Sequence, residues 1–333
     1  LTDILDLPLG KPEVRKTKAA IMKEGVVPLI LAKQNEGGYW GVAEDFYERA
    51  KYKGTVWTLL ILAELDADGR DERIKKACEF ILQYSQDRQS GGFAYTGSAE
   101  SGGHHSKVIP CLTGNMVWSL IRLGYLDDPR VQKGIDWITT YQRFDDRTDK
   151  PPKGWPYDIT LGCWGRHTCS MGAIKALKAL AEIPEQARPP QVKETLVQGA
   201  EYFLQHHVYK RSHNLEKVCK LGWLKFGFPL MYNTDALEIL GILTRLGYRD
   251  KRMQEAVDLV LSKQDDQGMW LLEHTYSGRF QVNIERKDKP SKWITLHALR
   301  VLQADGQWAY PVLLGILDDH SRLCGHLQWY LAE

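Results

Sequence analysis

The stretch Gln34-Asn-Glu-Gly-Gly38-Tyr-Trp40 decides the fold, because it returns near the other end of the chain as Gln264-Asp-Asp-Gln-Gly268-Met-Trp270. Both copies read Gln-x3-Gly-x-Trp. A motif that recurs within one chain indicates a repeat architecture, in which each copy marks the same place in one supersecondary unit. The first question for this sequence is therefore how many copies lie between these two.

Degenerate copies of the motif fill the interval. The second glutamine is followed by Gly-Gly-Phe and the third, after an insertion, by Gly-Trp, whereas the fourth has lost both its glycine and its tryptophan. Successive steps are 52, 56, 63 and 59 residues, at Gln34, Gln86, Gln142, Gln205 and Gln264. A period of this size is typical of a helical hairpin repeat.

Two kinds of helix are expected between the glutamines. Residues 129–141 and 252–263 place apolar side chains at a 3.6-residue spacing and polar ones opposite, as outer helices do. More apolar runs alternate with them, and each follows a threonine that we interpret as the helix N-cap: Thr55, Thr113, Thr168, Thr234 and Thr295. The prediction is an all-α (α/α)5–6 toroid, a single domain over residues 1–333, with repeats over about 10–305 and no assignment for 306–333.

Composition and charge exclude several classes of protein. The 333 residues carry 44 Lys and Arg against 42 Asp and Glu, a balance that argues against a nucleic-acid binder. No apolar run approaches the roughly 20 residues of a membrane span, and contact with a membrane surface is not indicated. The first residues lack the pattern of a signal peptide, and six cysteines do not make a disulfide framework in a chain this long. A cytoplasmic location is therefore expected.

The two complete motifs resemble the repeat motif of class II terpenoid cyclases such as squalene–hopene cyclase. The Gly91-Gly92-Phe93 copy is similar to its counterpart in protein prenyltransferase β subunits. The resemblance covers about residues 10–305 and implies a single toroid domain of that superfamily. It implies a structural role for the glutamine and tryptophan, which tie an outer helix to the next repeat. It also implies an isoprenoid, an isoprenoid diphosphate or another apolar substrate in a central aromatic-lined cavity.

Candidate catalytic and binding residues stand at the expected starts of the apolar helices. The cyclases carry an Asp-x-Asp-Asp acid motif there, and the matching stretch Tyr232-Asn-Thr-Asp235-Ala keeps only the last Asp. The resemblance thus implies Asp235 as a general acid, although helix capping explains it equally well. Polar groups vary at the neighbouring positions, which suggests a site built across repeats. We assign His297 to catalysis, and to substrate binding Trp57, Asn115, Trp164 and Trp293.

A metal site is also predicted, from four residues near two helix starts. Cys163, His167 and Cys169 have a Cys-x3-His-x-Cys spacing, and Cys111 precedes Thr113 on the neighbouring helix. Three thiolates and an imidazole suit zinc, with an iron–sulfur cluster as the alternative. A set of Cys169, Asp235 and His297 across successive helices is a second arrangement. Buried structural cysteines are the competing interpretation.

Three functions remain open at this point. The first is an enzyme of the isoprenoid cyclase or prenyl transferase type. The second is a carbohydrate-active α/α barrel, which needs paired carboxylates that the spacing does not show among Asp158, Asp235, Glu273 and Glu285. The third is a non-catalytic binding module with a structural metal. A fold alone does not decide among them.

Overall fold

The computed structural model describes the whole chain except residues 3, 48–50, 147–151, 160–161, 305 and 307–333. The unassigned segment 306–333 thus lies almost entirely outside the described residues. The α-helices, in chain order, are α1 (Pro12–Ile21), α2 (Val26–Leu31), α3 (Thr55–Glu64), α4 (Glu72–Tyr84), α5 (Pro110–Arg122), α6 (Pro129–Tyr141), α7 (Ser170–Glu182), α8 (Pro190–Gln205), α9 (Ala236–Arg245), α10 (Gln254–Ser262) and α11 (Lys292–Ala304).

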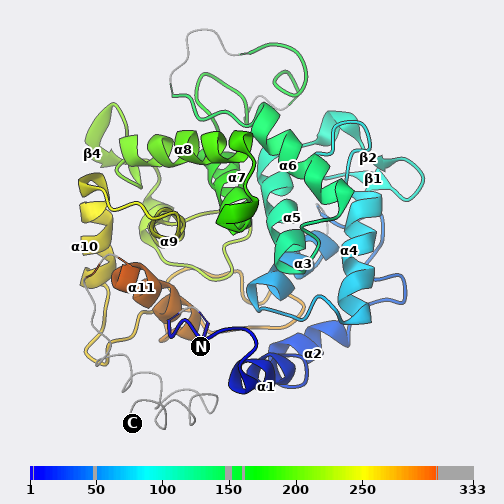
Figure 1. Ribbon diagram of the computed structural model, residues 1–333, viewed down its shortest axis with the longest axis horizontal. Helices are drawn as coiled ribbons and strands as arrows, with labels where there is room; N and C mark the ends of the chain where they lie inside the picture. The colour runs from blue at the N-terminus through cyan, green and yellow to red at the C-terminus, as the bar shows by residue number, and fades with distance from the viewer. Residues whose placement is uncertain (3, 48–50, 147–151, 160–161, 305, 307–333) are drawn as a thin grey trace.

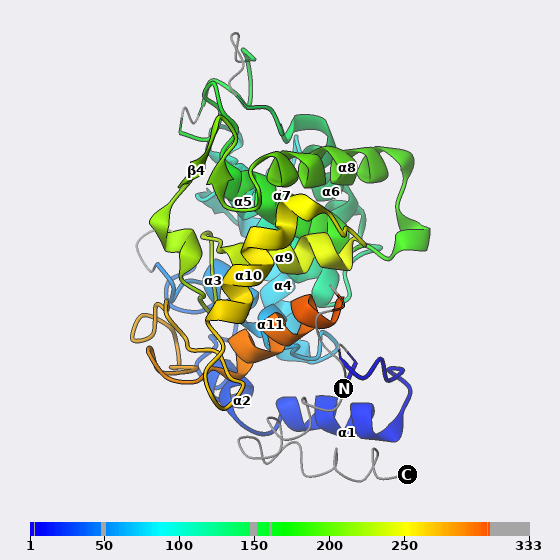
Figure 2. The same ribbon diagram turned by 90° about the vertical axis from the view of Figure 1, so that its left-hand side faces the viewer.

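The helices form two concentric rings (Figures 1 and 2). The inner ring runs α3, α5, α7, α9, α11, and each of these helices contacts the next. Residues 55–63 of α3 are buried all round, as its nearly uniform apolar sequence requires. Helices α4, α6, α8 and α10 lie outside and bury one face only. The prediction of an all-α toroid is confirmed.

Loops close the ring between α11 and α3. The ring of Tyr52 stacks on that of Tyr276 with centroids 4.1 Å apart. The side-chain amide of Gln281 donates to the carbonyl of Lys53 at 2.7 Å. Two small hairpins project from the helical rings: β1 (Gly97–Ser98) with β2 (Gly102–Gly103), and β3 (Lys210–Arg211) with β4 (Asn214–Val218). Both are antiparallel.

The repeated motif joins consecutive hairpins through side-chain hydrogen bonds. Gln34 donates to the carbonyl of Gly38 in its own loop at 3.1 Å and to that of Arg73 in the first turn of α4 at 2.8 Å. Gln86 makes the same pair of bonds to Gly91 and to Arg130 of α6. Gln264 bonds Gly268. These three glutamines therefore close their loops, and the first two also hold the next outer helix, whereas Gln142 bonds Arg143 and Thr168, and Gln205 bonds Glu201.

The interpretation of the five threonines as N-caps is wrong. The residues that cap helices α3, α5, α7 and α9 are Gly54, Ile109, Cys169 and Asp235. The hydroxyl of Thr55 instead accepts the backbone N–H of Trp40 at 3.1 Å, and Thr295 does the same for Trp270. A buried loop must satisfy its own N–H groups, and the threonine of the following inner helix supplies the acceptor.

Candidate functional site

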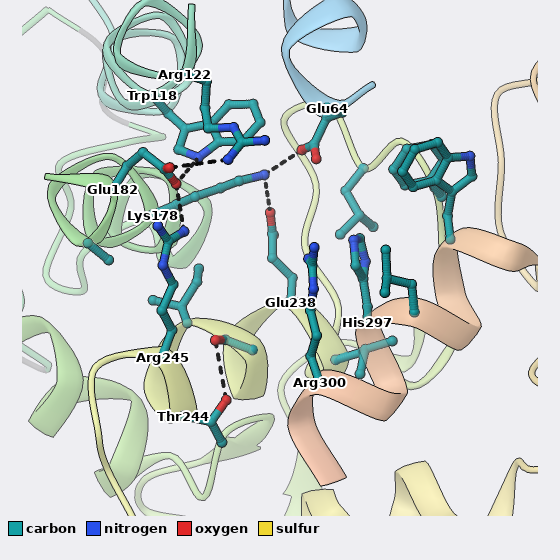
Figure 3. A pocket seen from close by; sticks show the side chains of 18 of the residues that line it. Glu64, Trp118, Arg122, Lys178, Glu182, Glu238, Thr244, Arg245, His297 and Arg300 are labelled. Atoms are coloured by element: carbon teal, nitrogen blue, oxygen red, sulfur yellow. Dashed lines mark hydrogen bonds and ion pairs between the residues drawn. The ribbon is translucent and has the colours of Figure 1, made fainter. Parts of the chain in front are cut away.

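A cavity of about 450 Å³ lies at the centre of the inner ring (Figure 3), within the usual range for small-molecule sites. The last residue of every inner helix lines it; α5, α7, α9 and α11 add a residue one turn earlier, and α9 and α11 also add residues two turns earlier. The charged and aromatic lining residues of the inner helices are Glu64, Trp118, Arg122, Lys178, Glu182, Glu238, Arg245, Trp293, His297 and Arg300.

Two lysines and two glutamates form an ion network across three helices on one side of the cavity. Lys178 of α7 bonds Glu64 of α3 at 2.5 Å and Glu238 of α9 at 3.2 Å. Lys175, which is buried beneath the wall, reaches both carboxylate oxygens of Glu238 at 2.7 Å. The Lys178 ammonium also lies 4.1 Å from the ring centroid of Trp118.

This network holds Glu238 ionised. Burial by itself raises the pKa of a carboxyl, but the ammonium groups of Lys175 and Lys178 outweigh it and bring the pKa of Glu238 to about 2. Burial lowers the pKa of Lys175, while Glu238 acts in the opposite direction. The cavity wall therefore presents fixed charges beside its apolar and aromatic side chains.

A second network stands where the inner helices end. Glu182 accepts hydrogen bonds from Arg245 at 2.6 Å, from the Trp118 indole at 3.2 Å and from Arg122 at 3.4 Å. Arg122 also bonds Asp66 at 3.0 Å. Arg245 is 53% exposed, whereas Asp235, at the opposite end of the lining, is 1% exposed. The cavity is therefore open at the carboxyl ends of the inner helices and closed at their amino ends.

Aromatic side chains and an imidazole form the closed part of the cavity. Phe228 stacks on Trp293 with ring centroids 4.8 Å apart and planes 10° apart, and His297 meets the edge of this pair at 6.0 Å. Burial lowers the pKa of His297, so its ring is neutral at pH 7. Three of the predicted site residues, Asp235, Trp293 and His297, line the cavity.

Asp235 both lines the cavity and caps α9. One carboxylate oxygen accepts the backbone N–H of Glu238 at 2.8 Å, and the other accepts that of Gly227 at 2.9 Å. Burial raises the pKa of this carboxyl to about 7, while the two N–H groups act against the shift. The structure shows the capping role, and acid catalysis by Asp235 stays a prediction.

We expect Asp235→Asn to cost stability at low pH and progressively less as the pH rises. The folded carboxyl titrates near 7 and the unfolded one near 3.8, so the folded state holds the extra proton between these values. Stability of the native chain therefore falls by up to about 1.4 kcal/mol per pH unit over this window. The asparagine variant cannot titrate at this position, so it lacks this pH-dependent contribution to stability. Urea unfolding at pH 4, 5, 6 and 7 measures the difference.

Asp250→Asn is the matched control, because Asp250 also caps a helical turn but has a pKa lowered by Arg252 to about 2. Its penalty should stay constant from pH 4 to 7. A constant penalty for Asp235→Asn as well would mean that Asp235 is ionised throughout.

Three predicted substrate-binding residues lie in the core, outside the cavity lining. Trp57 donates its indole N–H to the carbonyl of Tyr47 at 2.9 Å and packs among tyrosines. Trp164 is 2% exposed and packs on Trp137 and Tyr157. Asn115, 1% exposed, donates to the carbonyl of Met231 at 3.1 Å. Their positions give no support to ligand contact.

The predicted metal ligands do not converge as a set of four. The thiols of Cys163 and Cys169 interact directly, and Cys111 is near enough for its charge to act on Cys163. His167 instead bonds Asp146 at 2.5 Å, with 52% of its side chain exposed. Among the described residues no group of three or more His, Cys, Asp or Glu side chains is placed to hold a metal ion. Zinc and an iron–sulfur cluster stay untested predictions.

The threonines do not mark equivalent positions of the inner helices, so they do not predict the charged wall of the cavity, formed by Glu64, Lys178, Glu182 and Glu238 with the arginines at the helix ends. Thr55, Thr113 and Thr295 lie within their helices, but Thr168 and Thr234 each precede theirs by two residues. Alignment on the helix ends puts five residues in register instead: Trp57, Asn115, Lys175, Glu238 and His297. The recurring Arg-Leu-Gly-Tyr at Arg122 and Arg245 was the available signal. It marks the last residue of two inner helices, and both of these arginines line the cavity.

Comparison with solved structures agrees with this fold. A sugar epimerase from a ruminal bacterium is 14% identical, with a TM-score of 0.50 over 90% of this chain and 84% of its own. Cellobiose 2-epimerase from Bacillus thermoamylovorans is 13% identical, with a TM-score of 0.48 over 88% and 85%. A type II terpene cyclase from Scytonema is 13% identical, with a TM-score of 0.32 over 89% and 98%.

At 14% identity, the similarity to the sugar epimerase concerns the fold alone. No family model and no curated protein matches the chain. In the part of the chain that the structure describes, no helix is long and apolar enough to cross a bilayer.

Proposed function

We propose that the chain binds a sugar or a similar polyol in its central cavity and moves a proton on it, as a carbohydrate-active α/α toroid. One observation carries the proposal: ionised carboxylates and cations line the cavity beside flat aromatic rings. Glu64, Glu182 and Glu238 supply acceptors, Lys178 and Arg245 supply donors, and the rings include Trp118 and Trp293. Hydroxyl groups can bond such a wall, and the apolar faces of a sugar ring can pack on the aromatics.

The same wall disfavours a hydrocarbon substrate. A polyene that filled the cavity would strip water from the network of Lys178, Glu64 and Glu238 without replacing its hydrogen bonds. These groups would keep their ion-pair partners, but removing the remaining water from paired charges still costs free energy. The aromatic lining by Trp118, Phe228 and Trp293 is the observation that favours the isoprenoid alternative.

His297 is the group best suited to accept a proton. Its imidazole is neutral at pH 7 because burial lowers its pKa, and it lines the cavity. The pKa of Glu182 is lowered as well, since Arg245 and Arg122 outweigh the effect of burial. Asp235 carries a raised pKa, but both of its oxygens accept backbone N–H groups. A neutral imidazole beside carboxyl groups that are already hydrogen-bonded favours proton abstraction from, and return to, a carbon next to a carbonyl group. Hydrolysis would instead need a pair of free carboxyl groups.

The test combines binding with exchange in deuterium oxide. Titration calorimetry with hexoses and their disaccharides should show binding, and NMR should show deuterium entering a carbon position of the bound sugar. His297→Asn should keep binding and slow exchange by about 100-fold. His274→Asn is the matched control, because His274 is also half-buried with a pKa lowered by burial but does not line the cavity.

Two results would overturn the proposal. Binding of geranylgeranyl diphosphate with no binding of any sugar would restore the isoprenoid alternative. Unchanged exchange in His297→Asn would remove the assignment of that residue.

The cytoplasmic location stays a prediction.

A further inference from the structure

The sequence between Cys163 and Cys169 folds back on itself just before α7. Trp164 and Thr168 form an antiparallel bridge, and the N–H of Cys169 donates to the carbonyl of Cys163 at 3.3 Å. The two cysteines are therefore directly opposite each other, one step outside the bridge. Opposite residues of a hydrogen-bonded antiparallel pair have Cα atoms about 5.5 Å apart, within the range found for disulfides, and their Cβ atoms must approach to about 4 Å for the bond to form.

The two cysteine side chains are reduced and can be reached from solvent. Both cysteines are free thiols in the structure. Each is partly exposed, so a small reagent can reach the pair from solvent. Next to the pair, α7 packs closely on α5: a Cβ on Gly172 would lie 2.9 Å from the side chain of Pro110.

We propose that Cys163 and Cys169 form a dithiol site that exchanges with small disulfides of the glutathione type and closes into an intramolecular disulfide. One cysteine, as its thiolate, attacks a sulfur of the small disulfide. That S–S bond breaks, a protein mixed disulfide forms, and one small thiolate leaves and takes up a proton. The second cysteine loses its proton and attacks the mixed disulfide at the protein sulfur, which releases the second small thiol. Two electrons pass from the cysteine pair to the small disulfide.

The cysteine pair lies at the start of α7, the helix that contributes Lys178 and Glu182 to the cavity wall. Cys169 is the N-cap of α7, and Lys175, Lys178 and Glu182 follow on the same helix. Closure of the disulfide would fix the turn from which this helix begins. The proposal does not depend on the ligand of the cavity, because it concerns only the protein and the added disulfide.

The experiment is oxidation of the purified chain with glutathione disulfide at pH 8, followed by alkylation and peptide mass spectrometry. We expect one disulfide between Cys163 and Cys169, with Cys78 unreacted because it is fully buried. Cys163→Ser and Cys169→Ser should each stop at a stable mixed disulfide with one glutathione on the remaining cysteine. Cys219→Ser, which removes a free thiol outside the pair, should leave the disulfide unchanged.

Three outcomes would overturn the proposal. The first is a disulfide that joins Cys111 to either member of the pair. The second is a mixed disulfide in the native chain that never resolves. The third is one equivalent of zinc in the untreated chain, with thiols that react only after a chelator is added, which would support the predicted metal site instead. Near-UV circular dichroism of each variant shows whether it is folded before it is oxidised.

Discussion

Glu238→Leu should lower the free energy of unfolding by about 3–5 kcal/mol, because it leaves Lys175 buried without its counter-charge. Lys175 is 1% exposed, and its ammonium group donates to both carboxylate oxygens of Glu238 at 2.7 Å. Lys178 is less affected, since it keeps Glu64 at 2.5 Å. Urea unfolding at pH 7 measures the loss.

The double variant Lys175→Met with Glu238→Leu tests the mechanism. Removing both partners leaves no buried charge at this position, so most of the lost stability should return. Lys175→Met alone should cost less than Glu238→Leu alone, because Glu238 keeps Lys178 at 3.2 Å. Additive losses in the double variant would show that lost packing, rather than an uncompensated charge, causes the effect.

Trp270→Ala should also lower the free energy of unfolding by about 3–5 kcal/mol. The indole is fully buried, donates its N–H to the carbonyl of Val260 at 2.7 Å, and joins α10 to the loop before α11. Removal of so large a side chain leaves a cavity in the core and removes one of the two hydrogen bonds to the carbonyl of Val260. Thermal and urea unfolding of the variant measure the cost.

Trp270→Phe separates packing from hydrogen bonding. It keeps most of the buried ring but loses the N–H, so it should cost about 1–2 kcal/mol. Trp40→Ala should behave like Trp270→Ala, since its indole makes the equivalent bond to Ile30 at 2.9 Å. Unchanged unfolding midpoints with altered sugar binding would show that these tryptophans belong to the site and not to the repeat.

The cavity depends on structure that lies outside any single motif. Glu64, Arg122, Glu182 and Arg245 are the last residues of four different helices, and their side chains meet only because the helices form a ring. In the sequence each looks like an ordinary charged residue at a helix end, where solvent exposure is the usual outcome. Trp118 likewise looks like one core aromatic among many, although its N–H bonds Glu182.

Local sequence patterns also gave wrong predictions where the hydrogen-bond partner of a residue lies far away in the chain. Threonine before an apolar run is a common N-cap residue. The hydroxyls of Thr55 and Thr295 nevertheless accept backbone N–H groups from loops 15 and 25 residues earlier in the chain. The spacing of Cys163, His167 and Cys169 suits a metal, yet His167 bonds Asp146 on another loop. Spacing along the chain fixes which residues are neighbours in sequence, but not which side chain each one finds.

The sequence by itself determined the repeat of helical hairpins, whereas contacts between distant loops, such as Tyr52 with Tyr276, close the ring. The Gln-x3-Gly-x-Trp loops specify contacts that lie mostly within one hairpin or between consecutive ones, such as Gln34 with Gly38 and Arg73, so their pattern can be recognised along the chain. Only the tertiary structure decided the site. Lys178 meets Glu64 across 114 residues and Glu238 across 60, and such pairs leave no local pattern. Burial inside the ring then sets the charge states, because it removes the water that would otherwise screen these groups.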